Sequence, residues 1–254
     1  MKRFLSFIAV AALSCFVYGC IFTAPMKVVR GNGVSVTTAI EVPEFSAIHV
    51  VGSADVFYTQ GPQSVSLTAD ENLIEYYIVE VEEGKLVVRT EKGISLLPKA
   101  KSFITVSCPD LSGVTITGSG DCTVKEGLKA EGGFDFTVSG SGDLYADSIE
   151  CKEFTSKVAG SGDVKVDAIS CEASSMTIIG SGDIAVGSIS NSDMEIRISG
   201  SGDVAIGCQD AGDINVRISG SGDVKLWGKA RTLQYKVSGS GSVDSKRLAL
   251  SGTE

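Results

Sequence analysis

The chain has 254 residues, with 22 Lys or Arg against 31 Asp or Glu, a single His and a net charge of −9. An acidic chain repels phosphate backbones, which argues against nucleic-acid binding, and a lone imidazole leaves few routes to general-base catalysis. Hydrophobic residues make up 43% of the chain and charged residues 21%, as in a folded globular protein. We therefore expect a folded, non-enzymatic protein that needs no cofactor.

The N-terminus resembles a bacterial export signal with a lipid attachment site. Two basic residues precede an apolar run over residues 4–13 that is too short to span a bilayer comfortably. Residues 17–20 resemble a lipobox, in which the Cys is lipidated and becomes the first mature residue, although Tyr18 departs from the usual small residue. We expect residues 1–19 to be a lipoprotein signal peptide and Cys20 to carry the lipid, with simple cleavage and secretion as the alternative.

This N-terminal export signal predicts a protein of the cell envelope. A lipid on Cys20 would anchor it to a membrane, which we expect to be the outer membrane, with the protein facing either the periplasm or the outside. Residues 20–40, which contain the flexible run Gly31-Asn32-Gly33, predict a short tether. Residues 41–254 are then expected to form one folded domain.

The first part of this domain, residues 40–111, predicts several short strands. Segments 65–68, 86–89 and 103–106 are rich in apolar and β-branched residues and are separated by turn signals. Residues 50–58 contain Gly-Ser-Ala-Asp between two strand-like runs, which imitates a motif that recurs downstream. We expect these strands to form irregular early coils of a larger repeat structure.

An internal repeat is the strongest feature of the rest of the chain. The tetrapeptide Gly-Ser-Gly-Asp recurs at intervals of 22, 20, 20, 20 and 20 residues, and an altered copy, Gly-Ser-Gly-Ser, follows after 19 more. The copies begin at Gly118, Gly140, Gly160, Gly180, Gly200, Gly220 and Gly239. The repeat predicts a sharp corner at the same place in every unit, where two glycines permit positive φ angles.

Around each corner, apolar and polar positions alternate. The residue two positions before the first Gly is always β-branched and apolar: Ile116, Val138, Val158, Ile178, Ile198, Ile218 and Val237. A period of two indicates a strand with one buried face. One 20-residue unit buries about five aliphatic side chains, worth on the order of 10 kcal/mol, whereas ordering its backbone costs roughly 20–40 kcal/mol. Single coils cannot fold alone, so we predict an all-β fold, a parallel β-helix or β-solenoid of stacked coils of about 20 residues.

The order of these features resembles a known family. Phe45-Ser46-Ala47-Ile48, the Gly-Ser-Ala-Asp run at residues 52–55, Leu86-Val87-Val88, residues 109–114 and the Gly-Ser-Gly-Asp corners are together similar to the putative auto-transporter adhesin, head GIN domain family. The resemblance covers about residues 41–248. It implies a β-helical envelope protein, secreted or lipid-anchored, and it implies no catalytic residues.

The corner carboxylates are the residues that most suggest chemistry. They are Asp121, Asp143, Asp163, Asp183, Asp203 and Asp223. In register they would lie about 4.8 Å apart, where like charges repel by about 0.9 kcal/mol in water, so something must offset that repulsion. One interpretation is that each Asp accepts a backbone N–H within its own corner. A second is calcium held between successive corners, and a third is a catalytic carboxylate pair.

Other polar candidates have structural interpretations. The Ser residues of the corners form a column without an accompanying base, so we expect hydrogen bonding rather than nucleophilic catalysis. The single His, His49, is expected to lie in a strand as a satisfied or surface residue. Cys151 and Cys171 share one column and are expected to pack as small core residues, with a disulfide between them as the alternative. Trp227 and Tyr235 are expected to cap the core, although an aromatic pair can also contact a glycan.

Three functions from different classes remain. The leading prediction is a non-enzymatic, lipid-anchored envelope protein, an adhesin or surface-binding scaffold, that presents a rigid solenoid to a protein or polysaccharide partner. The alternatives are a calcium-stabilised structural solenoid and a polysaccharide-active β-helix enzyme. An open final coil also predicts association with further copies of the chain, giving a homo-oligomer.

Overall fold

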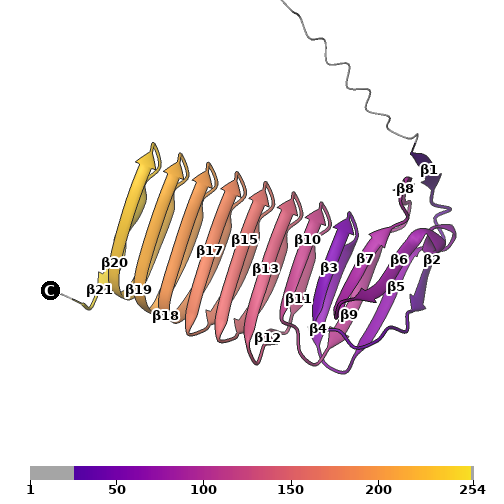
Figure 1. Ribbon diagram of the computed structural model, residues 1–254, viewed down its shortest axis with the longest axis horizontal. Helices are drawn as coiled ribbons and strands as arrows, with labels where there is room; N and C mark the ends of the chain where they lie inside the picture. Colours follow the sequence, from indigo (N-terminus) through magenta and orange to yellow (C-terminus); the bar gives the residue numbers. More distant parts are fainter. Residues whose placement is uncertain (1–25, 253–254) are drawn as a thin grey trace, which may run out of the picture.

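The computed structural model describes residues 26–252, which wind into a β-solenoid of stacked parallel strands. Figure 1 shows the coils following one another along a single axis, from β6 and β7 at one end to β20 and β21 at the other. In each repeat, one strand runs into the Gly-Ser-Gly-Asp corner and the next strand leaves it. The predicted all-β solenoid with a spacing of roughly 20 residues is confirmed.

The strands that run into the corners form one sheet, which we call the inbound sheet. Its strands pair in register, so each corner lies beside the equivalent corner of the next coil. In spatial order they are β6 (Tyr77–Glu82), β7 (Lys85–Thr90), β3 (Ala47–Gly52), β10 (Gly113–Gly118), β13 (Gly133–Gly140), β15 (Glu153–Gly160), β17 (Ala173–Gly180) and the second halves of β18 (Ile184–Gly200), β19 (Val204–Gly220) and β20 (Val224–Gly239).

The strands that leave the corners form the outbound sheet. In spatial order they are β2 (Ser35–Ala39), β5 (Ser64–Asp70), β9 (Phe103–Cys108), β4 (Asp55–Gln60), β11 (Cys122–Lys125), β14 (Leu144–Glu150), β16 (Val164–Ser170), the first halves of β18 to β20 and β21 (Val243–Leu250). Four smaller elements are the 3₁₀ helix η1 (Glu71–Tyr76), the short strand β12 (Leu128–Lys129) beside β14, and a separate parallel pair of strands, β1 (Lys27–Arg30) with β8 (Ile94–Leu97). No helix in this part of the chain is long and apolar enough to cross a membrane.

The core is a set of aliphatic columns enclosed between the two sheets. Ile178, Ile198 and Ile218 are direct partners in adjacent coils, and each exposes 2% of its surface or less. The apolar positions after the corner are equally buried, as Ile184 and Val204 show at 1% exposure each. The predicted stacking of like residues on like is therefore confirmed, and it makes each coil depend on its neighbours for burial.

Both glycines of a corner leave no room for a Cβ beside the neighbouring coil, as a Cβ at Gly200 would lie 2.1 Å from the carbonyl oxygen of Gly180, but only the first glycine has the predicted positive φ. Gly200 has a φ angle of +145°, which disfavours any residue with a side chain. Gly202 has no such angle, but a Cβ there would lie 2.0 Å from the carbonyl oxygen of Gly182 in the neighbouring coil. The second glycine thus allows close approach of two backbones rather than a positive φ.

The early coils are irregular in order as well as in shape. The coil formed by β3 and β4 pairs with β10 and β11 on one side and with β7 and β9 on the other. The coil of β3 and β4 comes first in the sequence but second in the stack. The strands β7 and β9, which follow it in the sequence, lie on its N-terminal side, and β10 and β11 continue the stack on its other side. The antiparallel strands β5 and β6 complete this end, since β5 pairs with β9 and β6 pairs with β7.

The segment predicted as a tether, residues 20–40, is ordered over its described part. Residues 27–30 form β1, and residues 35–39 pair with β5 as β2. Asp70 holds this segment against the folded domain, because its buried carboxylate accepts hydrogen bonds from the backbone N–H groups of Gly33, Lys99 and Ala100. Burial raises the pKa of Asp70, but these three donors together hold its pKa below the ordinary value. Residues 20–25 lie outside the described residues.

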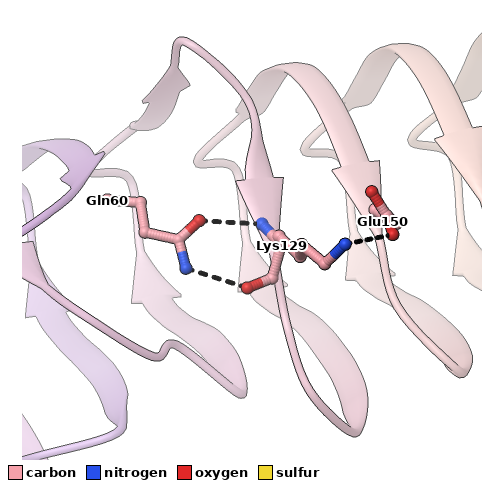
Figure 2. A network of polar contacts seen from close by, with 3 residues as sticks. All are labelled: Gln60, Lys129 and Glu150. Atoms are coloured by element: carbon pink, nitrogen blue, oxygen red, sulfur yellow. Dashed lines mark hydrogen bonds and ion pairs between the residues drawn. The ribbon is translucent and has the colours of Figure 1, made fainter.

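The coil between Gly118 and Gly140 is two residues longer than the next coils, and there a side chain takes over hydrogen bonds that backbone groups make elsewhere between coils. Glu126 and Gly127 both have positive φ angles and push the chain outward before β12. Figure 2 shows how Gln60 fills the gap, because its Oε1 accepts the Lys129 N–H at 2.9 Å and its Nε2 donates to the Lys129 carbonyl at 2.8 Å. Lys129 Nζ then reaches Glu150 Oε1 at 2.7 Å in the next coil. The Gln60 amide thus continues the ladder between coils.

Candidate functional site

The corner carboxylates form a ladder of hydrogen bonds between coils. Asp163 Oδ1 accepts the backbone N–H of Asp183 at 2.8 Å, and Asp183 Oδ1 accepts the N–H of Asp203 at 2.8 Å. The ladder starts at Asp55, which accepts the N–H of Asp121, and ends at Asp223, which accepts the N–H of Ser242. Each carboxylate therefore takes the place of a backbone carbonyl between two coils.

This geometry corrects the first interpretation of the Asp column. The acceptor role is right, but the N–H belongs to the next coil and not to the same corner, because the corner carbonyls are already engaged. Gly160, for example, accepts from the N–H groups of Ser181 and Gly182. Within residues 26–252, no group of three or more His, Cys, Asp or Glu residues is placed to hold a metal ion. Calcium binding by the column stays a prediction.

The remaining sequence candidates lie in structural positions. The corner Ser residues, such as Ser161 and Ser181, are exposed beside the Asp column. His49 lies in β3, half-buried, with Nε2 3.2 Å from Thr117 Oγ1, as expected for a satisfied residue. Neither arrangement brings a nucleophile and a base together.

The stacked cysteines are free thiols. Cys151 is buried and Cys171 is half-buried against the core, which fits their interpretation as small packing residues, and no disulfide joins them. Burial raises the pKa of the Cys151 thiol to about 11. Burial, and secondly the neighbouring Cys151, raise the pKa of Cys171 to about 12. Both thiols therefore stay protonated and weakly reactive at neutral pH.

The predicted aromatic cap is half wrong. Trp227 follows the buried Leu226 and lies on the outer surface of β20, where its indole covers Gly207 of the coil before it. Tyr235 does sit at the end of an interior column, as the partner of the buried Val216, but 60% of its surface is exposed. The two rings belong to different sheets and form no joint platform.

A groove on the outer face of the inbound sheet was not predicted. It has a volume of about 360 Å³ and runs across β17 to β20 between two outward rows. One row is Thr177, Arg197, Arg217 and Lys236, and the other is Ile179, Ser199, Ser219 and Ser238. The partners in each row lie in adjacent coils, so positive charge and hydroxyl groups repeat at the spacing of the coils, about 4.8 Å. We call this feature the cationic groove.

The cationic groove is held in shape by one shared carboxylate. Glu195 lies 2.5 Å from Arg197 and 2.7 Å from Arg217, so it spaces two guanidinium groups that would otherwise repel. Lys236 continues the row without an ion pair in the described part of the chain. The exposed Ile179, at 48%, adds an apolar surface at the other rim.

An acidic groove of about 460 Å³ lies alongside on the same sheet. Its charged lining residues are Glu153, Asp193, Glu195 and Asp213. Arg231 binds Asp213 with two hydrogen bonds, of 2.8 and 2.6 Å, and this contact, helped by Thr232, lowers the pKa of Asp213 to about 2. Asp213 therefore stays ionised at any physiological pH. The outer face is thus divided into parallel stripes of opposite charge.

The sequence contained the signal for the cationic groove. The position three before the first Gly reads Thr115, Thr137, Lys157, Thr177, Arg197, Arg217 and Lys236, and it changes from hydroxyl to cation along the chain. Within one repeat, this column shows only the polar half of a period of two. That it lies beside a row of Ser residues, with a groove between the two rows, follows only from the register of the coils.

Fold and surface together define an elongated β-solenoid scaffold with long outer faces and grooves. The sequence matches the family described as "Putative auto-transporter adhesin, head GIN domain" over residues 44–211 and again over residues 174–254. These matches cover most of the chain, and the protein belongs to this family. The predicted resemblance is confirmed.

Solved bacterial structures share the fold. A "putative adhesin" from Bacteroides fragilis NCTC 9343 has a TM-score of 0.76 at 20% identity and covers 85% of this chain and 99% of that chain. A "putative lipid binding protein" from Parabacteroides distasonis ATCC 8503 has a TM-score of 0.72 at 25% identity, over 86% of this chain and 99% of that chain. A "putative adhesin" from Parabacteroides merdae ATCC 43184 has a TM-score of 0.67 at 23% identity, over 86% of this chain and 99% of that chain.

No curated relative matches the sequence. The family and two of these structures are described as adhesins and not as enzymes. At family level, the protein is therefore an adhesin-like protein of the cell surface or envelope.

Proposed function

We propose that the protein is a non-enzymatic adhesin of the cell envelope, anchored to the outer membrane by a lipid on Cys20, and that its partner is a polysaccharide bound in the cationic groove. The observation that carries the ligand class is the pair of outward rows in register over β17 to β20. A polymer of similar units can make the same contact with each coil in turn, because every coil offers a similar group at the same position.

The lining of the cationic groove suits a sugar chain. Arg197 and Arg217 present planar hydrogen-bond donors, and Ser199 and Ser219 present hydroxyl groups opposite them. Between the rows lies the strand backbone, because Ile178, Ile198 and Ile218 face the core and expose 2% of their surface or less. The exposed Ile179 at the rim can contact the C–H faces of sugar rings, while the polar groups of the two rows fix their orientation. Acidic sugars gain an additional attraction from the three cations.

Glycan binding to the purified protein tests this site. We expect an array of bacterial and host polysaccharides to contain ligands, with preference for acidic ones, and we expect Arg217→Ala to weaken binding at least tenfold. Lys165→Ala, an exposed cation on the outbound sheet, is the matched control and should leave binding unchanged. A complete lack of glycan binding, or equal loss with both variants, would contradict the proposal.

A second occupant is suggested by the solved structure described as a lipid binding protein, which is 25% identical to this chain. The cationic row and the exposed Ile179 of the same groove also suit the headgroup and an apolar part of an anionic lipid. Vesicles of phosphatidylcholine with and without phosphatidylglycerol separate the two ligands. Binding to the anionic vesicles that is lost in Arg217→Ala, without glycan binding, would replace the polysaccharide by a lipid.

The proposed anchor is tested at Cys20, which lies outside the described residues. We expect labelled palmitate to be incorporated into the wild-type protein in cells and not into Cys20→Ser. Protease treatment of whole cells then distinguishes a protein facing outward from one facing the periplasm. An unlabelled wild-type protein released into the medium would contradict anchoring and support simple secretion.

A further inference from the structure

Both sheets of the solenoid end in strands that have one free edge. At one end of the inbound sheet, β6 pairs only with β7, and at the other end residues 232–239 of β20 pair only with β19. At the ends of the outbound sheet, β2 pairs only with β5, and β21 pairs only with β20. These are the pairings within residues 26–252, and Figure 1 shows β6 and β20 at opposite ends of the stack. Free edges expose unpaired N–H and C=O groups that can pair with another chain.

The interior columns are also open at both ends. At the β20 end, Tyr235 is 60% exposed, and Leu233 and Val237 are only partly buried although they continue core columns. At the β6 end, Val79 and Val81 are likewise only partly buried against the core. Each end therefore combines a strand edge with an incompletely covered apolar surface.

The two ends carry opposite charge. Residues 71–83, which form η1, β6 and its turn, contain five Glu and no Lys or Arg. Residues 231–250, which form the last inbound strand and β21, contain four Lys or Arg and one acidic residue, Asp244. In a chain with a net charge of −9, this basic end is an exception. Two identical basic ends repel each other, whereas a basic end attracts an acidic end.

We propose that copies of this chain associate head to tail, with the β20 end of one copy docked on the β6 end of the next. The inbound sheet then continues across the junction, and because β6 runs antiparallel to β7, the new seam between β20 and β6 is antiparallel. The outbound sheet extends one strand further at the β6 end, so β21 meets β2 there, and the axes of the two copies are inclined to each other. Tyr235 and Val237 of one copy cover Val79 and Val81 of the next. Such an interface is heterologous and does not close on itself, so it yields open chains of copies.

This assembly goes beyond the proposed ligand and does not depend on it. Its first test is sedimentation of the purified protein over a concentration series. We expect the mean mass to rise past that of a dimer with concentration and to fall with added salt, because opposite charges steer the contact. A monomer at all concentrations up to the millimolar range, at low salt, would overturn the proposal.

Cross-linking tests the orientation. Two variants, Tyr235→Cys and Val79→Cys, are purified separately, mixed and oxidised under denaturant-free conditions. We expect disulfide-linked dimers in the mixture and few in either variant alone, because only the β20 end and the β6 end meet. Efficient dimers of Tyr235→Cys alone would show that two β20 ends meet, and would overturn the head-to-tail arrangement.

A surface variant separates association from folding and from ligand binding. Tyr235→Glu changes a residue that is already 60% exposed, so the thermal midpoint of the dilute protein should stay unchanged, while self-association should weaken at least tenfold because the new carboxylate faces the acidic end. Ile179→Glu, at an exposed apolar residue of the cationic groove, should weaken ligand binding but not association. Equal association of Tyr235→Glu and wild type would contradict the junction and leave the proposed groove untouched.

Discussion

Replacing Asp203 by Asn tests what the Asp ladder does. The Asp203 Oδ1 accepts the N–H of Asp223 at 2.7 Å, while the Asp203 N–H donates to Asp183 Oδ1 at 2.8 Å. Asn keeps an acceptor oxygen at the same place and removes the negative charge. Ala removes both. The pair of variants therefore separates the hydrogen bond from the charge.

The magnitudes follow from the coil spacing. A carboxylate with like neighbours about 4.8 Å away on both sides is opposed by about 0.9 kcal/mol from each in water. A hydrogen bond to a charged acceptor contributes about 1.5–3 kcal/mol net and one to a neutral acceptor about 0.5–1.5 kcal/mol, so Asn weakens this bond by about 1 kcal/mol while it removes the repulsion from both neighbours. Asp203→Asn should therefore stabilise the fold by up to about 1 kcal/mol at low salt. Asp203→Ala gains the same relief but loses the whole hydrogen bond, so it should be neutral or destabilising by up to about 1 kcal/mol at low salt.

Urea unfolding followed by circular dichroism measures both changes. At about 1 M NaCl, where the screening length falls to about 3 Å, the advantage of Asn should vanish and Ala should become less stable than the wild type by about 2 kcal/mol. Destabilisation by Asn at both salt concentrations would refute the reasoning. If calcium also raised the midpoint of the wild type and not that of Asp203→Asn, the column would be a calcium site instead.

Three further changes test other parts of the fold. Gly202→Ala places a Cβ 2.0 Å from the carbonyl oxygen of Gly182, so it should destabilise the solenoid by about 1–3 kcal/mol or more in urea unfolding, whereas Gly132→Ala, with nothing within 4 Å, should have little effect. Ser156→Ala removes a buried hydroxyl that has no hydrogen-bond partner among the described residues, so it should raise the thermal midpoint; a lowered midpoint would show that the hydroxyl is satisfied. Asp70→Asn should lower the thermal midpoint at pH 7, and the difference should shrink as pH falls through the lowered pKa of Asp70, because a carboxylate with a depressed pKa stabilises the folded state only while ionised; a difference that is independent of pH would contradict this role.

The regular coils were predictable because their determinants are local and repeated. A spacing of about 20 residues and a period of two fixed the partners of Ile198 and the burial of its column, and the structure confirms both. The glycines were predicted at the right place, but the reason for the second one depends on the distance between two coils. No single repeat contains that information.

The N-terminal coils were predictable only as strands. Between residues 41 and 111 the spacing is not constant, so nothing local shows that β7 and β9 lie outside β3 and β4. Two long-range side-chain contacts fix the N-terminal segment and the first long coil. Asp70 orders the segment around Gly33, and Gln60 pairs with Lys129 across 69 positions of sequence. Contacts of this kind leave no periodic trace.

The structural constraints within each repeat explain why the proposed binding surface lies outside the most recognisable motif, the Gly-Ser-Gly-Asp corner. In the corner, both glycines are required by backbone geometry and packing, and the Asp Oδ1 is engaged by the next coil, as Asp163 is by Asp183. The glycines cannot vary without loss of stability, and the Asp oxygen is already engaged by the next coil, so none of these positions can adapt to a ligand. The outward rows carry no such constraint, and there the side chains change from Thr137 to Lys157 and Arg217 along the stack. Ligand specificity in such a solenoid is therefore expected where equivalent positions differ between coils, and the cationic groove is built from such positions.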